Sequence, residues 1–382
     1  MKTIRKLVYR EALSAIALVA VGFLSLFFFF DLVDELQYLG KNNVFGGVNN
    51  IYQIRHALLY VALLIPNHLY ELLPISVLIG SIFVMARLAQ SSEFTILRTS
   101  GLGPWRALRL LMTLGALFVV LSFVVGDYLA PAADRASQLL KARYQGRITI
   151  GQTGAWLKEK QGSRSYVVNV RALTADNAMQ GVRIFEFDSK GLVVATTEAA
   201  EARFTGGAEW ELSRAARTVF SVDSGPNAGA TGNAPTANVA RSTADPYRWP
   251  TEISAEMVSV ALLKPDRMAT VDLFNYVRHL TANGQSAQRY EIEFWKKVFY
   301  PLSCLVMVVL ALPFAYLHFR SGGVASYVFG GVMIGISFFL LNNVFGYIGN
   351  LQNWQPWLAA AAPGMLYTAI SLAAFSWLVL RR

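Results

Sequence analysis

Six long apolar stretches, separated by polar loops, dominate the pattern of this chain. A helix needs about 20 mainly apolar residues to cross a bilayer. The stretches that reach this length are Leu13–Leu36, Leu69–Leu88, Leu108–Leu129, Phe294–Leu317, Val324–Ile348 and Trp357–Leu380. Because Pro66 and Pro74 interrupt the second stretch, we expect an interfacial helix up to Ile65 and a span from Leu69.

The pattern changes between the third and fourth stretches. Ala132–Tyr144 keeps helical spacing, but from Ile148 to Val222 short runs rich in Val, Ile, Phe, Tyr, Trp and Thr alternate with glycine-containing turns. Such runs are typical of an antiparallel β-sandwich or an open barrel. Residues 224–246 are rich in Gly, Ala, Asn, Pro and Thr without periodicity and predict a flexible loop, whereas Val271–Leu280 has helical spacing again.

These patterns predict an α-helical membrane protein with six transmembrane helices and an all-β domain inserted after the third. The expected parts are helices 1–3 in residues 1–130 with a short helix at 91–101, the β domain in 131–268, a connecting helix in 269–289, and helices 4–6 in 290–382.

Composition and charge agree with this membrane class. Hydrophobic residues make up 54% of the 382 residues and charged residues only 15%, against about 25% charged in typical globular chains. Eleven of the Lys and Arg residues, with two acids, lie in the flanks that share a side with both termini, so these flanks carry 11 − 2 = +9 of the net +10. The positive-inside rule therefore predicts cytosolic termini and a β domain on the opposite side, and no nucleic-acid partner.

Sequence motifs for catalysis or metal binding are absent. The chain has no G-x-x-x-x-G-K-[ST], G-x-S-x-G or H-E-x-x-H motif, its four histidines are scattered, and its one cysteine, Cys304, lies in an apolar run. We therefore expect no catalytic residue, no metal site and no cofactor in this chain. The function classes that remain are a transport subunit that takes its energy from elsewhere and a membrane scaffold that displays a β domain; a lipid-modifying enzyme would lack its catalytic groups.

The loop Arg87–Gly101 is the most informative short segment. Ser91 or Ser92 can cap a helix that carries Glu93 in its first turn, where an acid is favourable to the helix dipole. With Phe94 and Leu97 exposed, this helix could dock into a groove on a cytosolic partner, or it could lie on lipid headgroups. Composition alone does not separate these two interpretations.

The chain resembles the permease subunits of the lipopolysaccharide export ABC transporter, the LptF/LptG family, and is more similar to the G-type member. Three sets of residues carry the resemblance: L-A-x-x-S-E-x-x-x-x-x-x-S-G at Leu88–Gly101, Ala130-Pro131, and the segment Leu273-Phe274-Asn275-Tyr276-Val277 … Gly284-Gln285 … Arg289-Tyr290 … Trp295-x-Lys297-x-Phe299-x-Pro301-Leu302-Ser303. The resemblance implies six helices, a periplasmic β-jellyroll and a place in the bacterial inner membrane.

The resemblance also implies partners. An LptF-type subunit would pair with this chain around a cavity open to the membrane, an LptB-type cytosolic ATPase dimer would bind ATP and Mg, and a single-span LptC-type protein would pass the lipopolysaccharide on to a periplasmic bridge. Glu93 matches the acid of the family's coupling helix, which contacts the ATPase. The residues implied in this coupling are Ser92, Glu93, Phe94, Leu97, Arg98 and Gly101.

The lipid site departs from the family pattern. The family places basic residues near the outer end of the first span, but here Asp31, Asp34 and Glu35 occupy that stretch and Lys41 is the only nearby cation. Lys141, Arg143 and Arg147 near the base of the β domain are candidate substitutes, or they form an ordinary solvated helix face. Phe27, Phe30 and Phe338 are expected in the apolar wall of the lipid cavity.

Overall fold

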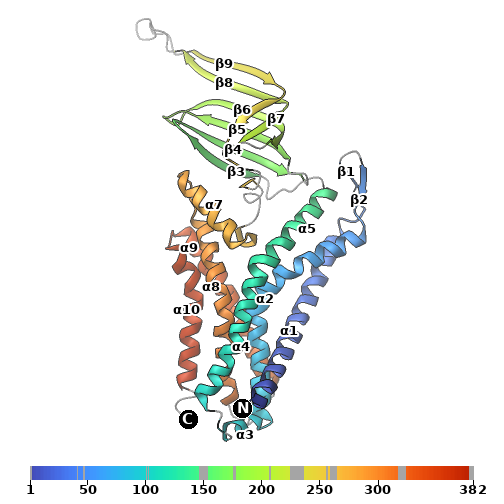
Figure 1. Ribbon diagram of the computed structural model, residues 1–382, viewed down its shortest axis with the longest axis vertical. Helices are drawn as coiled ribbons and strands as arrows, with labels where there is room; N and C mark the ends of the chain where they lie inside the picture. The colour runs from blue at the N-terminus through green and yellow to red at the C-terminus, as the bar shows by residue number, and fades with distance from the viewer. Residues whose placement is uncertain are drawn as a thin grey trace.

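The computed structural model places a helical bundle below a β domain (Figure 1). Both termini and the short helix α3 (Glu93–Thr99) lie at the end of the bundle that is farther from the β domain. We call this the terminal end and the opposite one the β-domain end. The structure describes residues 2–40, 42–45, 48–99, 101, 103–145, 154–174, 178–205, 208–223, 236–254, 257–258, 265–316 and 324–377.

Six helices are long and apolar enough to cross a membrane, as the sequence predicts. They are built from α1 (Lys2–Leu36), α2 (Ile54–Gln90), α4 (Pro104–Val124), α8 (Gln288–Ala311), α9 (Val324–Leu351) and α10 (Pro356–Phe375). The third span continues beyond α4 through a π-helical turn, η1 (Val125–Leu129), into α5 (Ala130–Gln145), which confirms the predicted helical extension. A 3-10 turn, η3 (Leu312–Tyr316), prolongs α8.

The prediction of a separate interfacial helix before the second span is wrong. α2 is one continuous helix of 37 residues that contains both Pro66 and Pro74. A proline inside a helix removes one backbone hydrogen bond and bends the axis without having to end the helix. In Figure 1 the upper part of α2 accordingly leans away from its lower part.

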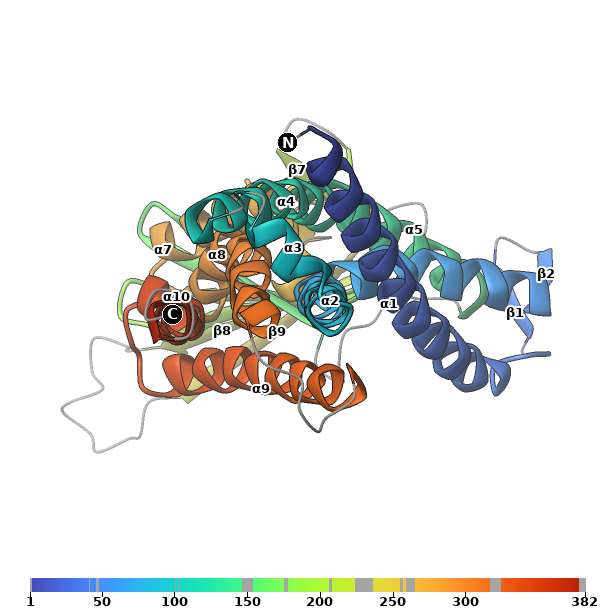
Figure 2. The same ribbon diagram turned by 90° about the horizontal axis from the view of Figure 1, so that it is seen from below.

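α2 forms the centre of the bundle, whereas α1 and α9 lie on its outside (Figure 2). Of the most apolar 18 residues in each span, 78% are buried in α2 but only 6% in α1 and 17% in α9. Small residues allow close helix contacts in the core. A methyl group added at Gly331 of α9 would lie 2.8 Å from Ile82 of α2, and one added at Gly335 would lie 2.9 Å from Ile75. The outer faces of α1 and α9 are therefore left to lipid or to another protein.

The β domain is an antiparallel sheet of eight strands in the order β10-β7-β6-β5-β4-β3, with β8 paired to β6 and β9 paired to β8. The strands are β3 (Ala155–Gln161), β4 (Arg164–Leu173), β5 (Met179–Phe187), β6 (Val193–Phe204), β7 (Glu209–Ser213), β8 (Ala215–Asp223), β9 (Thr236–Ala244) and β10 (Tyr247–Pro250). A small hairpin of β1 (Asn42–Phe45) and β2 (Val48–Ile51) joins α1 to α2. The sheet confirms the all-β insertion after the third span.

One predicted loop is partly a strand. Within 224–246, residues 224–235 lie outside the described part, but Thr236–Ala244 forms β9 and pairs with β8 along its whole length. Its sequence, TANVARSTA, lacks a clear alternation of apolar and polar residues. Backbone pairing to a neighbouring strand, rather than local propensity, holds such a segment in a sheet.

Helix α7 (Thr270–Ala282) completes the core of the β domain. Its buried Leu273, Tyr276 and Leu280 belong to the same apolar cluster as Trp210 and Trp249 of the sheet. Burial raises the pKa of Tyr276. α7 then leads into α8, so the helix that closes the β domain is also the one that joins it to the fourth span.

Candidate functional site

The predicted coupling helix exists as α3, but one of its side chains is not where the sequence suggested. Phe94 is 5% exposed, so the prediction that it projects into solvent is wrong. Its ring lies 5.1 Å from the ring of Tyr316 at the end of the fourth span, and the Arg98 guanidinium lies 5.7 Å from that ring. Phe94 therefore anchors α3 to the bundle, while Glu93 and Ile96 are exposed.

The N-terminal end of α3 is held by a backbone hydrogen bond, and the glycine that follows its C-terminal end is held by an arginine side chain. Ser92 has a positive φ of 61°, and its carbonyl oxygen, rather than its hydroxyl group, accepts the N–H of Ile96 at 3.2 Å. Gly101 has φ +98°, and its carbonyl accepts a hydrogen bond from Arg106 Nη1 at 2.9 Å. Leu97 lines a narrow apolar crevice beside Phe94. Four of the six predicted coupling residues therefore lie in α3, and Ser92 and Gly101 flank it. The helix is fixed to the bundle and has one solvent-exposed face.

Lys141, a predicted lipid-phosphate contact, is paired inside the protein. Its Nζ donates to Glu35 Oε2 at 3.2 Å, and the Glu35 side chain is only 4% exposed. The Tyr52 hydroxyl donates to the other oxygen, Oε1, at 2.9 Å. Burial and this hydrogen bond raise the pKa of Tyr52. Lys141 also lies 4.4 Å from the centre of the Tyr60 ring, so this partly exposed cation has partners within the protein.

The acids at the β-domain end of α1 mostly point inward. Asp31 Oδ2 lies 2.7 Å from His68 Nε2 of α2, and the ring of Phe27 lies 4.8 Å from the His68 ring. Asp34 is exposed. Two of the three acids in the stretch where the family has basic residues are therefore paired: Glu35 with Lys141, and Asp31 with His68. The sequence could not reveal this, since Glu35 and Lys141 are 106 residues apart.

The other predicted cations cannot be placed in the same way. Lys41 and Arg147 lie outside the described residues, and Arg143 lies in α5 with a side chain that is not described.

The predicted apolar wall is divided between two environments. Phe27 and Phe30 on α1 are exposed, with 36% and 56% of their surface accessible. Phe338 on α9 is buried, with its ring 6.4 Å from that of Tyr300 and 5.1 Å from that of Tyr367. Phe338 is therefore part of the bundle core and not of an open wall.

A polar cavity of about 510 Å³ lies at the β-domain end between α2, α8, α9 and the segment before α7. Its lining residues are Asn67, Tyr70, Glu71, Pro265, Asp266, Arg289, Glu293, Lys296, Lys297, Tyr300, Phe339, Asn342 and Asn343. Sequence reasoning missed this cavity. The available signals were the pairs Lys296-Lys297 and Asn342-Asn343 inside otherwise apolar spans.

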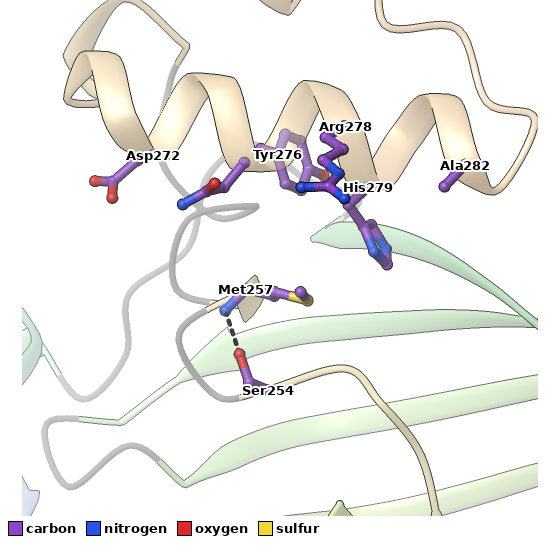
Figure 3. Close-up of a pocket in the computed structure, with 8 residues that line it drawn as sticks. Ser254, Met257, Asp272, Tyr276, Arg278, His279 and Ala282 are labelled. Atoms are coloured by element: carbon purple, nitrogen blue, oxygen red, sulfur yellow. Dashed lines mark hydrogen bonds between the residues drawn. The ribbon is translucent and has the colours of Figure 1, made fainter.

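A second cavity, of about 420 Å³, separates α7 from the segment that follows β10. In Figure 3 His279 projects from α7 on the side that faces Met257 and Ser254. The Ser254 hydroxyl accepts the N–H of Met257 at 3.2 Å. Asp272, at the other end of this face, forms an ion pair with Arg135 of α5. Burial lowers the pKa of His279.

Three contacts connect the third span to the segment that carries α7. The Asp127 carboxylate, on the π-helical turn, accepts the N–H of Thr270 at 2.6 Å. Arg267 donates to Asp134 at 2.7 Å, and the third contact is the Arg135 ion pair. Among the described residues, no group of three or more His, Cys, Asp or Glu side chains could hold a metal ion.

Six membrane-length helices, an antiparallel β domain inserted after the third, and one short helix fixed at the terminal end define a multi-pass membrane protein with an inserted β domain. The family described as "Lipopolysaccharide export system permease LptF/LptG" matches residues 6–380. The chain belongs to this family.

Curated relatives agree with the family. The chain is 26% identical over 352 residues to the Lipopolysaccharide export system permease protein LptG of Escherichia coli (strain K12), covering 92% of this chain and 90% of the relative. It is 23% identical over 383 residues to the protein of the same name from Haemophilus influenzae, covering 100% of this chain and 99% of the relative.

Proposed function

We propose that this chain is the G-type permease subunit of a lipopolysaccharide exporter in a bacterial inner membrane. In this role it pairs with an LptF-type subunit, extracts lipopolysaccharide from the outer leaflet, and passes it by way of its β domain to an LptC-type partner and a periplasmic bridge. The positive flanks support an orientation with the termini and α3 in the cytosol and the β domain in the periplasm.

The observation that carries this proposal is the uncovered apolar surface of α1 beside the paired polar groups at its β-domain end. Only 6% of the apolar core of α1 is buried, and Phe29 and Phe30 are 58% and 56% exposed. A lipid with several acyl chains needs a wide apolar wall with polar groups at headgroup depth. An F-type subunit facing α1 and α9 encloses this wall, so that the acyl chains exchange one apolar surface for another.

External work is needed because each buried CH₂ of a lipid contributes about 0.8 kcal/mol to its retention in the bilayer. The chain has no nucleotide-binding motif, so an LptB-type ATPase dimer binds ATP and Mg and transmits its movement through α3. The buried Phe94 ring fixes α3 to the bundle, and the exposed Glu93 and Ile96 form the face that enters the ATPase groove.

Photo-crosslinking tests the proposed lipid path. A crosslinking amino acid at Phe30 should capture lipopolysaccharide in the assembled complex, whereas the same group at the buried Phe338 should not, although both replace a phenylalanine in a membrane helix. Equal capture at the two positions, or capture of phospholipid alone at Phe30, would refute the path.

A second experiment separates transport from the scaffold function. Glu93→Arg should release the ATPase or uncouple its turnover from lipid, while Thr95→Arg, an exposed neighbour on α3, provides the matched control. If no ATPase copurifies with the unmodified chain, the scaffold function is favoured instead.

A further inference from the structure

The polar cavity lies between α2, α8 and α9, on the β-domain side of two close contacts between α2 and α9. The two helices touch at Ile82–Gly331 and, nearer the β domain, at Ile75–Gly335, which is one turn farther along α9 and about two turns along α2. One further turn along both helices, Phe339 and Glu71 line the cavity. Arg289 and Tyr300, both on its wall, are eleven residues apart on α8, which corresponds to about 16 Å along the helix axis. The cavity therefore extends from the end of the span into the depth of the bilayer.

Some of its charged groups are satisfied within the protein. Lys296 Nζ lies 2.8 Å from Glu293 Oε1. The buried Lys297 donates to the carbonyl oxygen of Gly126 at 2.9 Å. Asn67 donates to Glu71 Oε1 at 3.0 Å. Lys296 and Glu293 thus form an ion pair, Lys297 has a neutral backbone acceptor, and one oxygen of Glu71 has a donor.

The groups that are left have opposite charges. Within the described part of the chain, Arg289 and Asp266 make no hydrogen bond or ion pair, and no described side chain donates to Glu71 Oε2. Asn342 and Asn343 likewise offer unbonded amides to the same cavity. Charged and polar groups at membrane depth are costly when they face acyl chains. The cavity thus presents one guanidinium group and two carboxylates to whatever fills it.

We propose that this cavity binds the zwitterionic headgroup of a phospholipid that carries a phosphate and a primary ammonium group. The planar guanidinium of Arg289 suits two phosphate oxygens, while Glu71 and Asp266 accept the N–H groups of the ammonium. Exposed Phe339 and Leu340 on α9 provide an apolar surface for the acyl chains. A cavity of 300–1,000 Å³ holds a small organic group, and about 510 Å³ falls within this range.

The charge balance selects among headgroups. The cavity is lined by three cations (Arg289, Lys296 and Lys297) and three acids (Glu71, Asp266 and Glu293), so an anionic headgroup without an amine would add an unbalanced negative charge. A quaternary ammonium has no N–H to donate to the carboxylates. This inference concerns a bilayer phospholipid and does not depend on the proposed export function.

Native mass spectrometry tests the site. The full-length chain, assembled in nanodiscs containing equal amounts of phosphatidylethanolamine, phosphatidylglycerol and phosphatidylcholine, should retain phosphatidylethanolamine preferentially on release. Arg289→Gln and Glu71→Gln should each reduce this retention roughly tenfold, because each removes a charge-assisted hydrogen bond. The matched controls are Arg55→Gln and Asp34→Asn, which remove an exposed cation and an exposed acid elsewhere at the β-domain end.

Asp266→Asn is a third cavity variant, chosen because Asp266 is exposed and its substitution should not disturb the helix packing. It separates loss of lipid binding from loss of folding. It should also lower phosphatidylethanolamine retention. Equal retention of the three lipids, or retention by all three cavity variants at the level of the controls, would overturn the proposal. Replacement of the phospholipid by added lipopolysaccharide in this cavity would overturn it as well, while leaving the export function standing.

Discussion

The Glu35–Lys141 pair offers the sharpest test of how the β-domain end is held together. Lys141→Leu keeps an apolar stem beside Tyr60 but leaves the Glu35 carboxylate, 4% exposed, without its cation. Removing one partner of a buried ion pair costs about 3–5 kcal/mol. Because Lys141 is itself 28% exposed, we expect the lower end, about 3 kcal/mol.

The assay is unfolding of the purified full-length chain in mixed micelles by SDS titration, followed by tryptophan fluorescence. Glu35→Gln in the Lys141→Leu background removes the unpaired charge and keeps an acceptor for the Tyr52 hydroxyl, so it should recover most of the loss. Lys141→Arg is the charge-preserving control. Wild-type stability of Lys141→Leu, or no recovery in the double variant, would show that the pair does not stabilise this region.

Three further outcomes follow from the packing and the titrating groups. Phe94→Ala should destabilise the chain by about 3–4 kcal/mol in the same SDS titration, whereas Ile96→Ala, on the exposed face of α3, should cost less than about 0.5 kcal/mol; similar losses for both would contradict the anchoring role. Gly126→Ala adds a methyl group that overlaps the ring of Tyr70, so its thermal unfolding should shift by the equivalent of about 1–3 kcal/mol, and an unchanged midpoint would show that the two helices separate freely. Burial lowers the pKa of His279, so as the pH falls the unfolded chain takes up a proton before the folded chain does. The stabilisation that is present above about pH 6.5 should therefore be lost as the pH decreases. His279→Gln should flatten this pH dependence of β-domain unfolding, and an equally steep profile would exclude this residue as its source.

The six spans and the β insertion could be predicted because both depend on local patterns. A run of about 20 apolar residues is long enough to cross a bilayer as a helix, and short alternating runs separated by glycine turns are typical of strands in a sheet. β9 could not be predicted, because TANVARSTA carries no alternation and is a strand only through its pairing with β8. The continuity of α2 was missed because a proline can either end a helix or only bend it, and the surrounding sequence does not distinguish the two outcomes.

The site depended on contacts between distant residues. Phe94 looked like a docking residue on a surface helix, but α3 folds back so that the ring reaches Tyr316. Lys141 looked like a solvated or lipid-binding cation until Glu35 was found beside it. In each case the residue type was noticed correctly, and the partner that decides its role lies more than 100 residues away along the chain or in another span.

The length of the third span has a geometric consequence for cargo. Pro104–Lys141 is a helical rod of 38 residues, about 57 Å long, whereas the hydrocarbon layer is about 30 Å thick. Roughly half of the rod therefore extends beyond the hydrocarbon layer toward the β domain (Figure 1). A lipid that travels to the sheet must carry its acyl chains out of the hydrocarbon layer before it arrives, so these chains need continuous shelter from water along the way.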